Sequence, residues 1–297
     1  MKKYAIVADS CCDLNKEFRT KHHIDYAHMS LTWTDKNGVL HDTFADMDWE
    51  VISPKDFYDT LRSGIRIYTA QTTVQDYLDV FEPHLQKGED VLYLACSSGL
   101  SASINVAKML AENDLKEKYP NNRLVVIDTL RAGMAQGMII MEAVRLQEEE
   151  GKSIDEVAEV IEKIKTSYKE VGIPETLTYL KRAGRVNGPT ALMGNLISLK
   201  PILVFDEKGV NQAKEKAIGR KKAYLRMAEM IRDDIVDPEN QEIYLMSADC
   251  RPEDIQMFKD AILKQVKVKN IIIEPLGPII GASSGPGTII VNYRGKQ

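Results

Sequence analysis

Four serines around one glycine form the part of this sequence best suited to chemistry. They lie in the segment Ser97-Ser98-Gly99-Leu100-Ser101-Ala102-Ser103, which follows an apolar run at 91–95 and precedes residues with helical apolar spacing. A strand that leads through a hydroxyl-rich loop into a helix can hold a small anion, because the first helical N–H groups lack partners and the helix dipole favours negative charge. Serines also cap helices, so Ser101 or Ser103 could be an N-cap and nothing more. Capping needs only one or two of the four, and the loop as a whole therefore predicts an anion-binding site.

Two other apolar runs, at 4–8 and 124–128, end in similar polar residues. The first is followed by Asp9-Ser10, and the second ends in Asp128-Thr129. In an open parallel sheet, ligands bind outside the carboxyl ends of the strands, near the point where the strand order reverses. The three strand ends therefore predict one polar rim. We interpret Asp9 and Asp128 as hydrogen-bond acceptors that orient the loops rather than as reactive carboxylates.

The alternation of short apolar runs with amphipathic segments predicts a parallel sheet covered on both faces. Helices are expected at 74–85, 104–117, 132–150 and 153–168, and the last begins with a capping box formed by Ser153 and Glu156.

From about residue 170 the pattern changes. Strands are expected at 213–218, 243–247, 271–275 and 288–293, with fewer helices between them. We therefore expect an α/β protein of two domains with a boundary at Lys169–Gly172. An N-terminal, Rossmann-like parallel-sheet domain would cover 1–169, and a C-terminal mixed α/β domain would cover 170–297.

The composition favours an ordinary globular protein. The chain has 297 residues, of which 44% are hydrophobic and 28% charged, and a net charge of −5 argues against a protein that tracks nucleic-acid phosphates. One basic cluster is more simply a solvated helix face; its members are Lys214, Lys216, Arg220, Lys221, Lys222 and Arg226. The N-terminal apolar run is too short for a signal peptide, and no run could span a bilayer, so a cytoplasmic location is expected.

The cysteines and histidines give catalysis no positive support. Cys11, Cys12, Cys96 and Cys250 have neither a CxxC pair nor zinc-site spacing, and we expect reduced thiols. All five histidines lie in the first third of the chain, and GxSxG, HExxH and P-loop motifs are absent from the sequence. We therefore predict no catalytic residue, no metal site and no cofactor.

Two other functional classes stay open. A serine- or cysteine-dependent acyl-transfer enzyme would use Cys96 or a loop serine as its nucleophile. A phosphate- or nucleotide-binding protein would use the serine loop together with the glycine-rich segment 281–287.

Several segments, taken in order, resemble the DegV-type lipid-binding proteins, which include the binding subunits of bacterial fatty-acid kinase. In the first half they are Asp9-Ser10 with Asp13-Leu14, Thr69-Ala-Gln71, Ser97-Ser98-Gly-Leu-Ser101, and Asp128-Thr129 leading to Gly133 and Gly137. In the second half they are Leu177-Thr-Tyr-Leu-Lys-Arg-Ala-Gly184-Arg185-Val, Leu199-Lys-Pro-Ile-Leu203 and Gly277-Pro-Ile-Ile-Gly281-Ala-Ser-Ser-Gly285-Pro286-Gly287. The resemblance spans nearly the whole chain.

The resemblance implies that a long-chain fatty acid is buried in a cavity between two domains and is presented to a fatty-acid kinase that forms an acyl phosphate. The residues that it assigns to the carboxyl group are Thr69, Ser97 and Ser98, supported by Ser101, Asp9, Ser10, Ser283 and Gly285. It assigns partner or phosphotransfer contacts to Arg185, Lys216 and Arg220. The residues expected to form the apolar wall, although ordinary core packing would explain them equally well, are Met193, Leu196, Ile197, Leu199, Ile202 and Leu203. In this reading the protein is not an enzyme itself, and the fatty acid is its ligand.

Three positions depart from the family pattern. The family's Thr-Ser-Gln-Pro-Ser is here Thr69-Ala70-Gln71-Thr72-Thr73, which loses one hydroxyl and a proline. Ser283 stands where the family usually carries histidine, and Ile218 stands where it often carries arginine. The last two changes affect the head group and the kinase contact, so lipid binding is the better supported half of the prediction.

Overall fold

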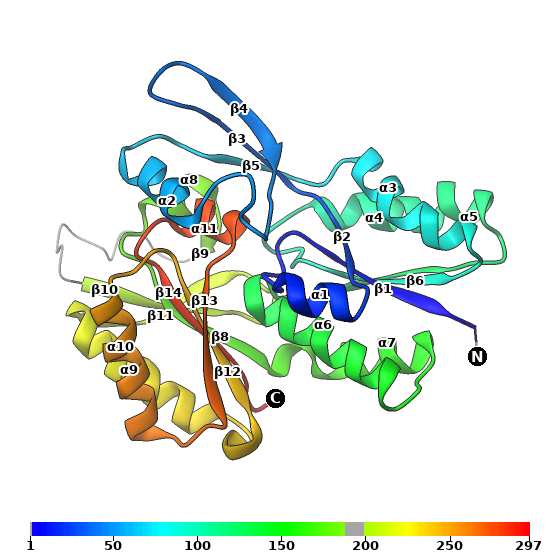
Figure 1. Ribbon diagram of the computed structural model, residues 1–297. Coiled ribbons are helices and arrows are strands. Elements are labelled where there is room, and N and C mark those ends of the chain that lie inside the picture. The colour runs from blue at the N-terminus through cyan, green and yellow to red at the C-terminus, as the bar shows by residue number, and fades with distance from the viewer. Residues whose placement is uncertain (1, 188–198) are drawn as a thin grey trace. The chain divides into compact units, whose positions relative to one another are not determined.

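The computed structural model describes residues 2–187 and 199–297, which form two compact units (Figure 1). The first unit comprises the residues up to Val51 together with Arg66–Thr166, and the second comprises Ile52–Ile65 together with Ser167–Gln297. The first contains a parallel sheet and the second a mixed sheet. The predicted fold class is confirmed.

The first unit is built on a four-stranded parallel sheet with the order β2-β1-β6-β7. Its strands are β1 (Tyr4–Asp9), β2 (Asp25–Ala27), β6 (Asp90–Ala95) and β7 (Leu124–Asp128). The chain passes from β1 to β2 on one side and later places β6 on the other side of β1. The strand order therefore reverses between β1 and β6, and their carboxyl ends mark the switch point at which such sheets bind ligands.

Helices cover both faces of this sheet. They are α1 (Lys16–Lys21), α3 (Val74–Gln86), α4 (Ser103–Glu112), α5 (Asp114–Lys118), α6 (Gly133–Glu148) and α7 (Ile154–Ile164), followed by the 3₁₀ turn η1 (Lys165–Ser167). In Figure 1, α3 and α4 lie on one side of the sheet and α6 and α7 on the other. The capping box at the start of α7 is confirmed, because the Glu156 N–H donates to Ser153 Oγ and the Ser153 N–H donates to the Glu156 carboxylate.

Two predicted helices end earlier than expected. The segment 104–117 is broken at Asn113, whose φ of −121° and ψ of −90° are not helical, so α4 and α5 are separate helices. The segment 153–168 leaves the α-helix after Ile164, and Tyr168 begins a strand instead. Pairing of that strand with neighbours on both sides outweighs the local helical pattern.

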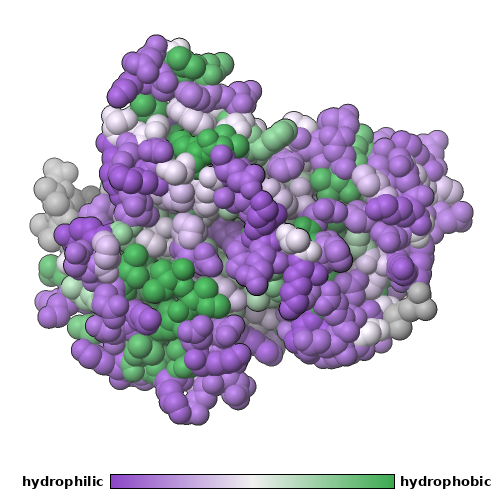
Figure 2. Space-filling model, viewed as in Figure 1, coloured by the Kyte–Doolittle hydropathy of each residue, from purple (hydrophilic) through white to green (hydrophobic). Residues whose placement is uncertain are grey.

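A second, antiparallel sheet in the first unit was not predicted. It has the order β4-β3-β5 and consists of β3 (Ser30–Thr34), β4 (Leu40–Phe44) and β5 (Tyr68–Ala70). The turn between β3 and β4 is held by Asp35, whose Oδ1 accepts the N–H groups of Asn37 and Val39. Figure 2 shows hydrophobic atoms on this hairpin, where Leu40 and Phe44 are 66% and 54% exposed.

The second unit is built on a seven-stranded mixed sheet with the order β13-β12-β14-β8-β10-β11-β9. Its strands are β8 (Tyr168–Ile173), β9 (Val186–Asn187), β10 (Leu199–Phe205), β11 (Asn211–Ile218), β12 (Glu242–Ser247), β13 (Asn270–Pro275) and β14 (Ile289–Arg294). Its helices are α2 (Pro54–Arg62), α8 (Thr178–Ala183), α9 (Gly219–Asp234), α10 (Pro252–Gln265) and α11 (Pro278–Ser284), with the 3₁₀ turn η3 (Pro238–Asn240). Each of the four strands predicted in this half of the chain coincides with an observed strand.

The core of the second unit lies between its sheet and the helix pair α9 and α10. Tyr224 of α9 stacks on Phe258 of α10 with ring centroids 4.8 Å apart, and both side chains are fully buried. Alternate residues of β14, namely Ile289, Val291 and Tyr293, belong to the same cluster. This period-2 burial places one face of the sheet against the two helices.

The segment 52–65 belongs to the second unit although it lies within the predicted first domain, 1–169. The buried Tyr58 hydroxyl donates to the Leu276 carbonyl oxygen at 2.7 Å, across 218 positions of sequence. A Cβ atom at Gly281 would overlap the Tyr58 ring, so glycine permits this close approach of α2 and α11. The predicted boundary at Lys169–Gly172 falls inside β8, whereas the contacts divide the chain between Thr166 and Ser167.

His84, near the end of α3, lies between two carboxylates of the first unit. Its Nε2 is 2.9 Å from Asp25 Oδ2, and its Nδ1 is 3.0 Å from Glu89 Oε2. The bond to Asp25 raises the pKa of His84 above its ordinary value; burial opposes the rise, and Glu89 adds to it. The same bond lowers the pKa of Asp25.

We expect this cluster to make the protein less stable as the pH rises above neutrality. A histidine with a raised folded-state pKa contributes fully below its unfolded pKa of about 6.5 and loses that contribution as the pH rises through the folded value. The lowered pKa of Asp25 contributes above about pH 4, so the cluster is most stabilising between about pH 4 and pH 6.5. Urea unfolding at about pH 5.5 and about pH 8.5 measures the difference in the free energy of unfolding between the two conditions. This difference should be smaller in His84→Gln than in the wild type. An equal difference in both proteins would contradict this account.

Candidate functional site

Asp9 organises the rim at the switch point of the parallel sheet. It ends β1 and is fully buried, and its two carboxylate oxygens accept hydrogen bonds from four donors. Those donors are the N–H groups of Cys11 and Cys96, the Tyr93 hydroxyl and the Gln136 side-chain amide. The carboxylate thus joins the loop after β1 to the end of β6 and to α6.

The pKa values around Asp9 follow from burial. Burial raises the pKa of the Asp9 carboxyl above its ordinary value, and the hydrogen bonds that it accepts oppose the rise because they stabilise the carboxylate. Burial, followed by the nearby Asp9 charge, raises the pKa of the Tyr93 hydroxyl well above its ordinary value. Tyr93 is therefore a hydrogen-bond donor to Asp9, and Asp9 is an orienting acceptor, as the sequence predicted.

The serine loop after β6 uses most of its hydroxyls internally. Ser97 is fully buried and its Oγ accepts the Gly99 N–H at 3.1 Å, while Ser101 Oγ accepts the Ser103 N–H at 3.2 Å. Ser103 Oγ is 2.9 Å from the Tyr77 hydroxyl. The N-cap of α4 is Ala102, which makes no side-chain cap bond, so neither Ser101 nor Ser103 is the N-cap residue.

Ser98 differs from the other serines of the loop. Its side chain is exposed, and its hydroxyl makes no hydrogen bond within the described ranges 2–187 and 199–297. Its N–H donates to Asp128 Oδ1, which also accepts the Leu130 N–H. Asp128 therefore fixes the backbone of the loop and leaves the Ser98 hydroxyl available to a ligand.

Of the two remaining carboxyl-site predictions in this unit, Ser10 is used internally and Thr69 is not. Ser10 is fully buried, and its Oγ accepts the Met29 N–H at 2.9 Å. Thr69 lies on the exposed strand β5, and within the described part of the chain its hydroxyl has no hydrogen-bond partner. The Thr72 N–H, just after β5, donates to Ser103 Oγ and ties this segment to the end of the serine loop.

The structure therefore sorts the six predicted carboxyl-site residues of the first unit into two groups. Four hold the loops through bonds within the protein; they are Asp9, Ser10, Ser97 and Ser101. The Oγ atoms of Ser10 and Ser101 are acceptors in these bonds, whereas the hydroxyls of Thr69 and Ser98 make no hydrogen bond within the described residues and can donate to an added anion. Hydroxyl donors of this kind suit a carboxylate or another small anion.

The two predicted residues of the second unit lie at the end of α11. Ser283 is half-buried in the last turn of the helix, and Gly285 follows at its C-cap. Gly285 has a φ of +82°, and a Cβ there would overlap the Tyr179 ring. Glycine is thus required at this turn for both its conformation and its close packing.

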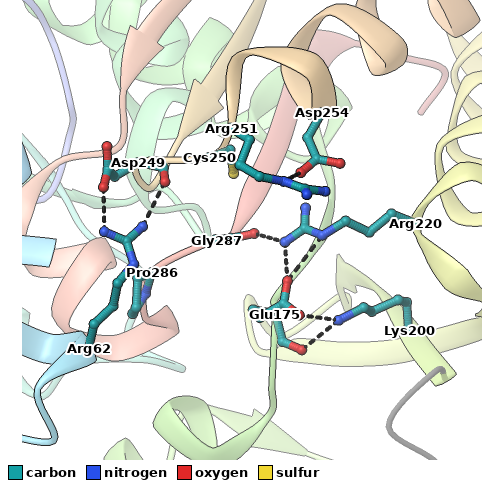
Figure 3. A pocket seen from close by; sticks show the side chains of 10 residues that line it. All are labelled: Arg62, Glu175, Lys200, Arg220, Asp249, Cys250, Arg251, Asp254, Pro286 and Gly287. Carbon is teal, nitrogen blue, oxygen red and sulfur yellow. Dashed lines mark hydrogen bonds and ion pairs between the residues drawn. The ribbon is translucent and has the colours of Figure 1, made fainter. Parts of the chain in front are cut away.

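Arg220 lies in a pocket of about 550 Å³ in the second unit (Figure 3). Its guanidinium bonds the Glu175 carboxylate, the Gly287 carbonyl oxygen and the Tyr224 hydroxyl. Burial alone would raise the pKa of Glu175, but Lys200 and Arg220 outweigh it and hold that pKa below its ordinary value. Arg220 therefore stabilises the glycine-rich turn at the end of the segment 281–287 through its bond to Gly287.

The other cations of this pocket are also paired with carboxylates. Arg62 bonds Asp249, and Arg251 bonds Asp254. Figure 3 shows these pairs around Pro286 and Gly287. The pocket therefore has four cations and three carboxylates in its lining, because Lys200 and Arg220 share Glu175.

The remaining predicted contacts are dispersed. Arg185 donates to the Ala183 carbonyl oxygen next to its own turn, and Lys216 is exposed on β11. In the predicted apolar wall, Ile202 belongs to the core beside α9, and Leu203 packs with Leu177 and Leu180. Leu199 is half-buried, whereas Met193, Leu196 and Ile197 lie outside the described residues.

With this geometry in place, the family can be assigned. The family model described as an uncharacterised protein of the DegV family matches residues 3–295. The chain belongs to the DegV family. DegV domain-containing protein CPE0026 of Clostridium perfringens is 34% identical over 295 residues, covering 99% of this chain and 98% of that protein. YteA of Lactococcus lactis is 28% identical, covering 97% and 96%.

Solved DegV structures share the fold across the whole chain. A DegV family protein from Thermus thermophilus, described for its fatty acid binding, has a TM-score of 0.82 at 26% identity and covers 99% of this chain and 100% of its own. DegV of Bacillus subtilis, described as a fatty acid binding protein, has a TM-score of 0.82 at 23% identity and full coverage of both chains.

Across residues 2–187 and 199–297, no cluster of three or more His, Cys, Asp or Glu side chains could hold a metal ion. No helix in the described part of the chain is long and apolar enough to cross a membrane.

Sequence reasoning missed three residues that build this DegV rim. Tyr93 and Gln136 bond Asp9, and Cys11 places its Sγ 3.4 Å from that of Cys96. Because successive side chains of a strand point to opposite faces, the position of Tyr93 in β6 could have placed it on one face of the sheet. The contact between the two cysteines spans 85 positions of sequence and has no local signal.

Proposed function

We propose that this chain binds a long-chain fatty acid and holds the carboxylate at the hydroxyls of Thr69 and Ser98. The observation that carries the proposal is that these two hydroxyls, alone among the six predicted carboxyl-site residues of the first unit, have no hydrogen bond within the described chain. Ser98 lies at the switch point, where parallel sheets bind ligands, and Thr69 lies three residues before Thr72, whose N–H donates to Ser103 Oγ in the same loop. The fatty acid binding described for the Thermus thermophilus relative supports the choice of ligand.

Hydroxyl donors suit a carboxylate that must later react. A neutral cradle bonds the carboxylate without an opposite charge, so the head group can leave as an acyl phosphate without breaking a buried ion pair. The tail supplies the affinity. About 16 methylenes at about 0.8 kcal/mol each contribute on the order of 12 kcal/mol before ordering costs are subtracted.

The resemblance supports a second part of the proposal, in which the loaded protein is the co-substrate of a fatty-acid kinase. Ser283 lacks the imidazole usual in the family, and Ile218, which is 63% exposed, lacks the guanidinium. An imidazole can bring a positive charge to a head group and a guanidinium bonds a phosphate in bidentate fashion, whereas the Ser283 hydroxyl is uncharged and the Ile218 side chain forms no hydrogen bond. Turnover of the bound lipid by a bacterial fatty-acid kinase should therefore be slow and should rise in Ile218→Arg with Ser283→His.

Organic extraction of protein purified from a bacterial host tests the binding. We expect about one long-chain fatty acid per chain, because the buried tail should survive purification. The extracted and reloaded protein is then incubated with the kinase and ATP, and acyl phosphate is quantified for the wild type and the double variant at equal loading. A protein that carries nucleotide in place of lipid would overturn the proposed function. Fast wild-type turnover that the double variant does not exceed would overturn the argument from Ser283 and Ile218.

A further inference from the structure

Two thiols meet at the switch point of the parallel sheet. Cys11 lies in the loop after β1 and Cys96 directly follows β6, and their Sγ atoms are 3.4 Å apart. Both are buried, at 2% and 4% exposure, and neither is in a disulfide. Fatty-acid binding as proposed above uses neither sulfur atom.

We propose that Cys11 and Cys96 are an oxidative modification site, at which a small hydroperoxide converts the two thiols into a disulfide that closes across β1 and β6. The modification changes the serine loop at the rim. The site is distinct from the hydroxyls of Thr69 and Ser98, and it stands whether or not the ligand is a fatty acid.

The two sulfur atoms are already in contact. Cys11 lies two residues after the end of β1 and Cys96 directly follows the neighbouring strand β6, and their Sγ atoms are 3.4 Å apart. The S–S bond length of about 2.05 Å requires the sulfur atoms to approach by a further ~1.4 Å. Side-chain rotation with a small loop movement can supply this approach.

The other two cysteines are poorer partners. Cys12 is adjacent to Cys11, and a Cα separation of about 3.8 Å across one trans peptide is too short for an unstrained disulfide. Its Sγ instead lies 3.8 Å from Met47 Sδ. Cys250 belongs to the second unit, where its Sγ lies 3.3 Å from the Thr288 carbonyl oxygen.

The chemistry balances with one peroxide per pair. One sulfur attacks a peroxide oxygen, the O–O bond breaks, and the products are a sulfenic acid and one water. The second sulfur attacks the sulfenic sulfur, the S–O bond breaks, and a second water leaves with the remaining thiol proton. Two thiols have then lost two electrons in total, and hydrogen peroxide has gained them. A resolving thiol at 3.4 Å makes the second step faster than attack by another peroxide.

Burial sets the rate and the size of the oxidant. The bond to Cys96, together with desolvation, raises the pKa of Cys11 well above its ordinary value, so little thiolate is present at neutral pH. The reaction is therefore slow. The low exposure of Cys11 and Cys96, 2% and 4%, favours a small oxidant such as hydrogen peroxide over bulky thiol reagents.

The disulfide acts on the rim through the backbone of the two cysteines. The N–H groups of Cys11 and Cys96 both donate to Asp9, and the Cys11 carbonyl oxygen accepts the Gly133 N–H at the start of α6. Ser97 directly follows Cys96. Drawing the sulfur atoms together must therefore shift the serine loop relative to the loop after β1.

The experiment treats the reduced full-length protein with hydrogen peroxide for several hours. The protein is then alkylated under denaturing conditions and digested without reductant. Because peroxide also adds oxygen to methionine, and the chain has 12 methionines, the readout is the cross-linked peptide rather than the intact mass. We expect a peptide joining Cys11 to Cys96 that has lost two hydrogen atoms and disappears on reduction with dithiothreitol. Hydrogen exchange of the amides at 97–103 should change on oxidation and return after reduction.

Variants identify the pair. Cys250→Ser and Cys12→Ser should form the same cross-link, and Cys11→Ser and Cys96→Ser should not. The wild-type peptide map decides the pairing by itself, so a variant that fails to fold does not remove the test. Alkylation of both Cys11 and Cys96 after peroxide has oxidised exposed methionines would overturn the proposal, as would a Cys11–Cys12 cross-link. Unchanged exchange at 97–103 in the cross-linked protein would overturn the effect on the loop.

Discussion

Replacing Asp9 by alanine should lower the free energy of unfolding by about 3–5 kcal/mol. The substitution removes the acceptor of four buried donors, two of them backbone N–H groups. Each orphaned buried donor costs about 1–3 kcal/mol, but the four are neighbours whose costs do not add, and water entering the vacated space relieves some of them. Urea-induced unfolding measures the loss.

Two variants make this test specific. Asp9→Asn keeps the shape and one carbonyl oxygen, and should cost about 1–3 kcal/mol. Asp128→Ala removes a half-buried carboxylate that accepts the N–H groups of Ser98 and Leu130, and should cost less than Asp9→Ala. If Asp9→Ala unfolds within about 1 kcal/mol of the wild type, Asp9 does not organise the rim.

The largest effect on binding is expected at Thr69 and Ser98. Thr69→Val and Ser98→Ala each remove a hydroxyl that donates to the ligand carboxylate in the proposed site. The loss of one such bond should cost about 1–3 kcal/mol, or roughly 5- to 150-fold in fatty-acid affinity. Stability should stay within about 0.5 kcal/mol, because both residues are exposed and neither hydroxyl bonds the described chain. Equilibrium titration of the delipidated variants with a long-chain fatty acid measures the affinity.

Thr34→Val is the matched control for Thr69→Val. Thr34 is an exposed threonine of the same three-stranded sheet, on β3, and was not predicted to touch the ligand. Its replacement should leave the affinity unchanged. If Thr69→Val and Ser98→Ala bind as tightly as Thr34→Val, the carboxylate lies elsewhere.

The sequence predicted the elements that carry strong local patterns. The buried strands β1, β6 and β7 are near-continuous apolar runs, and the capping box of Ser153 and Glu156 fixes the start of α7. Their polar ends also predicted the rim, since parallel strands share one carboxyl edge. The strands of sheet β4-β3-β5 have only three to five residues. β3 alternates buried Leu31 and Trp33 with polar residues, but β4 and β5 show no such alternation, and the sheet was not predicted.

Most of the features that the sequence did not predict depend on contacts between residues far apart in the chain. The segment 52–65 joins the second unit through Tyr58, whose partner Leu276 is 218 positions away. The serine loop was correctly placed at the rim, but sequence could not separate Ser98 from Ser97 and Ser101. That separation depends on which hydroxyls the folded backbone already uses.

Native mass spectrometry of the full-length protein tests the central claim most directly. The purified protein is measured as isolated, after removal of bound lipid, and after addition of a long-chain fatty acid. We predict one fatty-acid adduct per chain at the start, its loss on delipidation, and its return at a ratio of one to one, with a weaker return in Thr69→Val with Ser98→Ala. A chain that carries no fatty acid as isolated and stays unoccupied at saturating fatty acid would contradict the account.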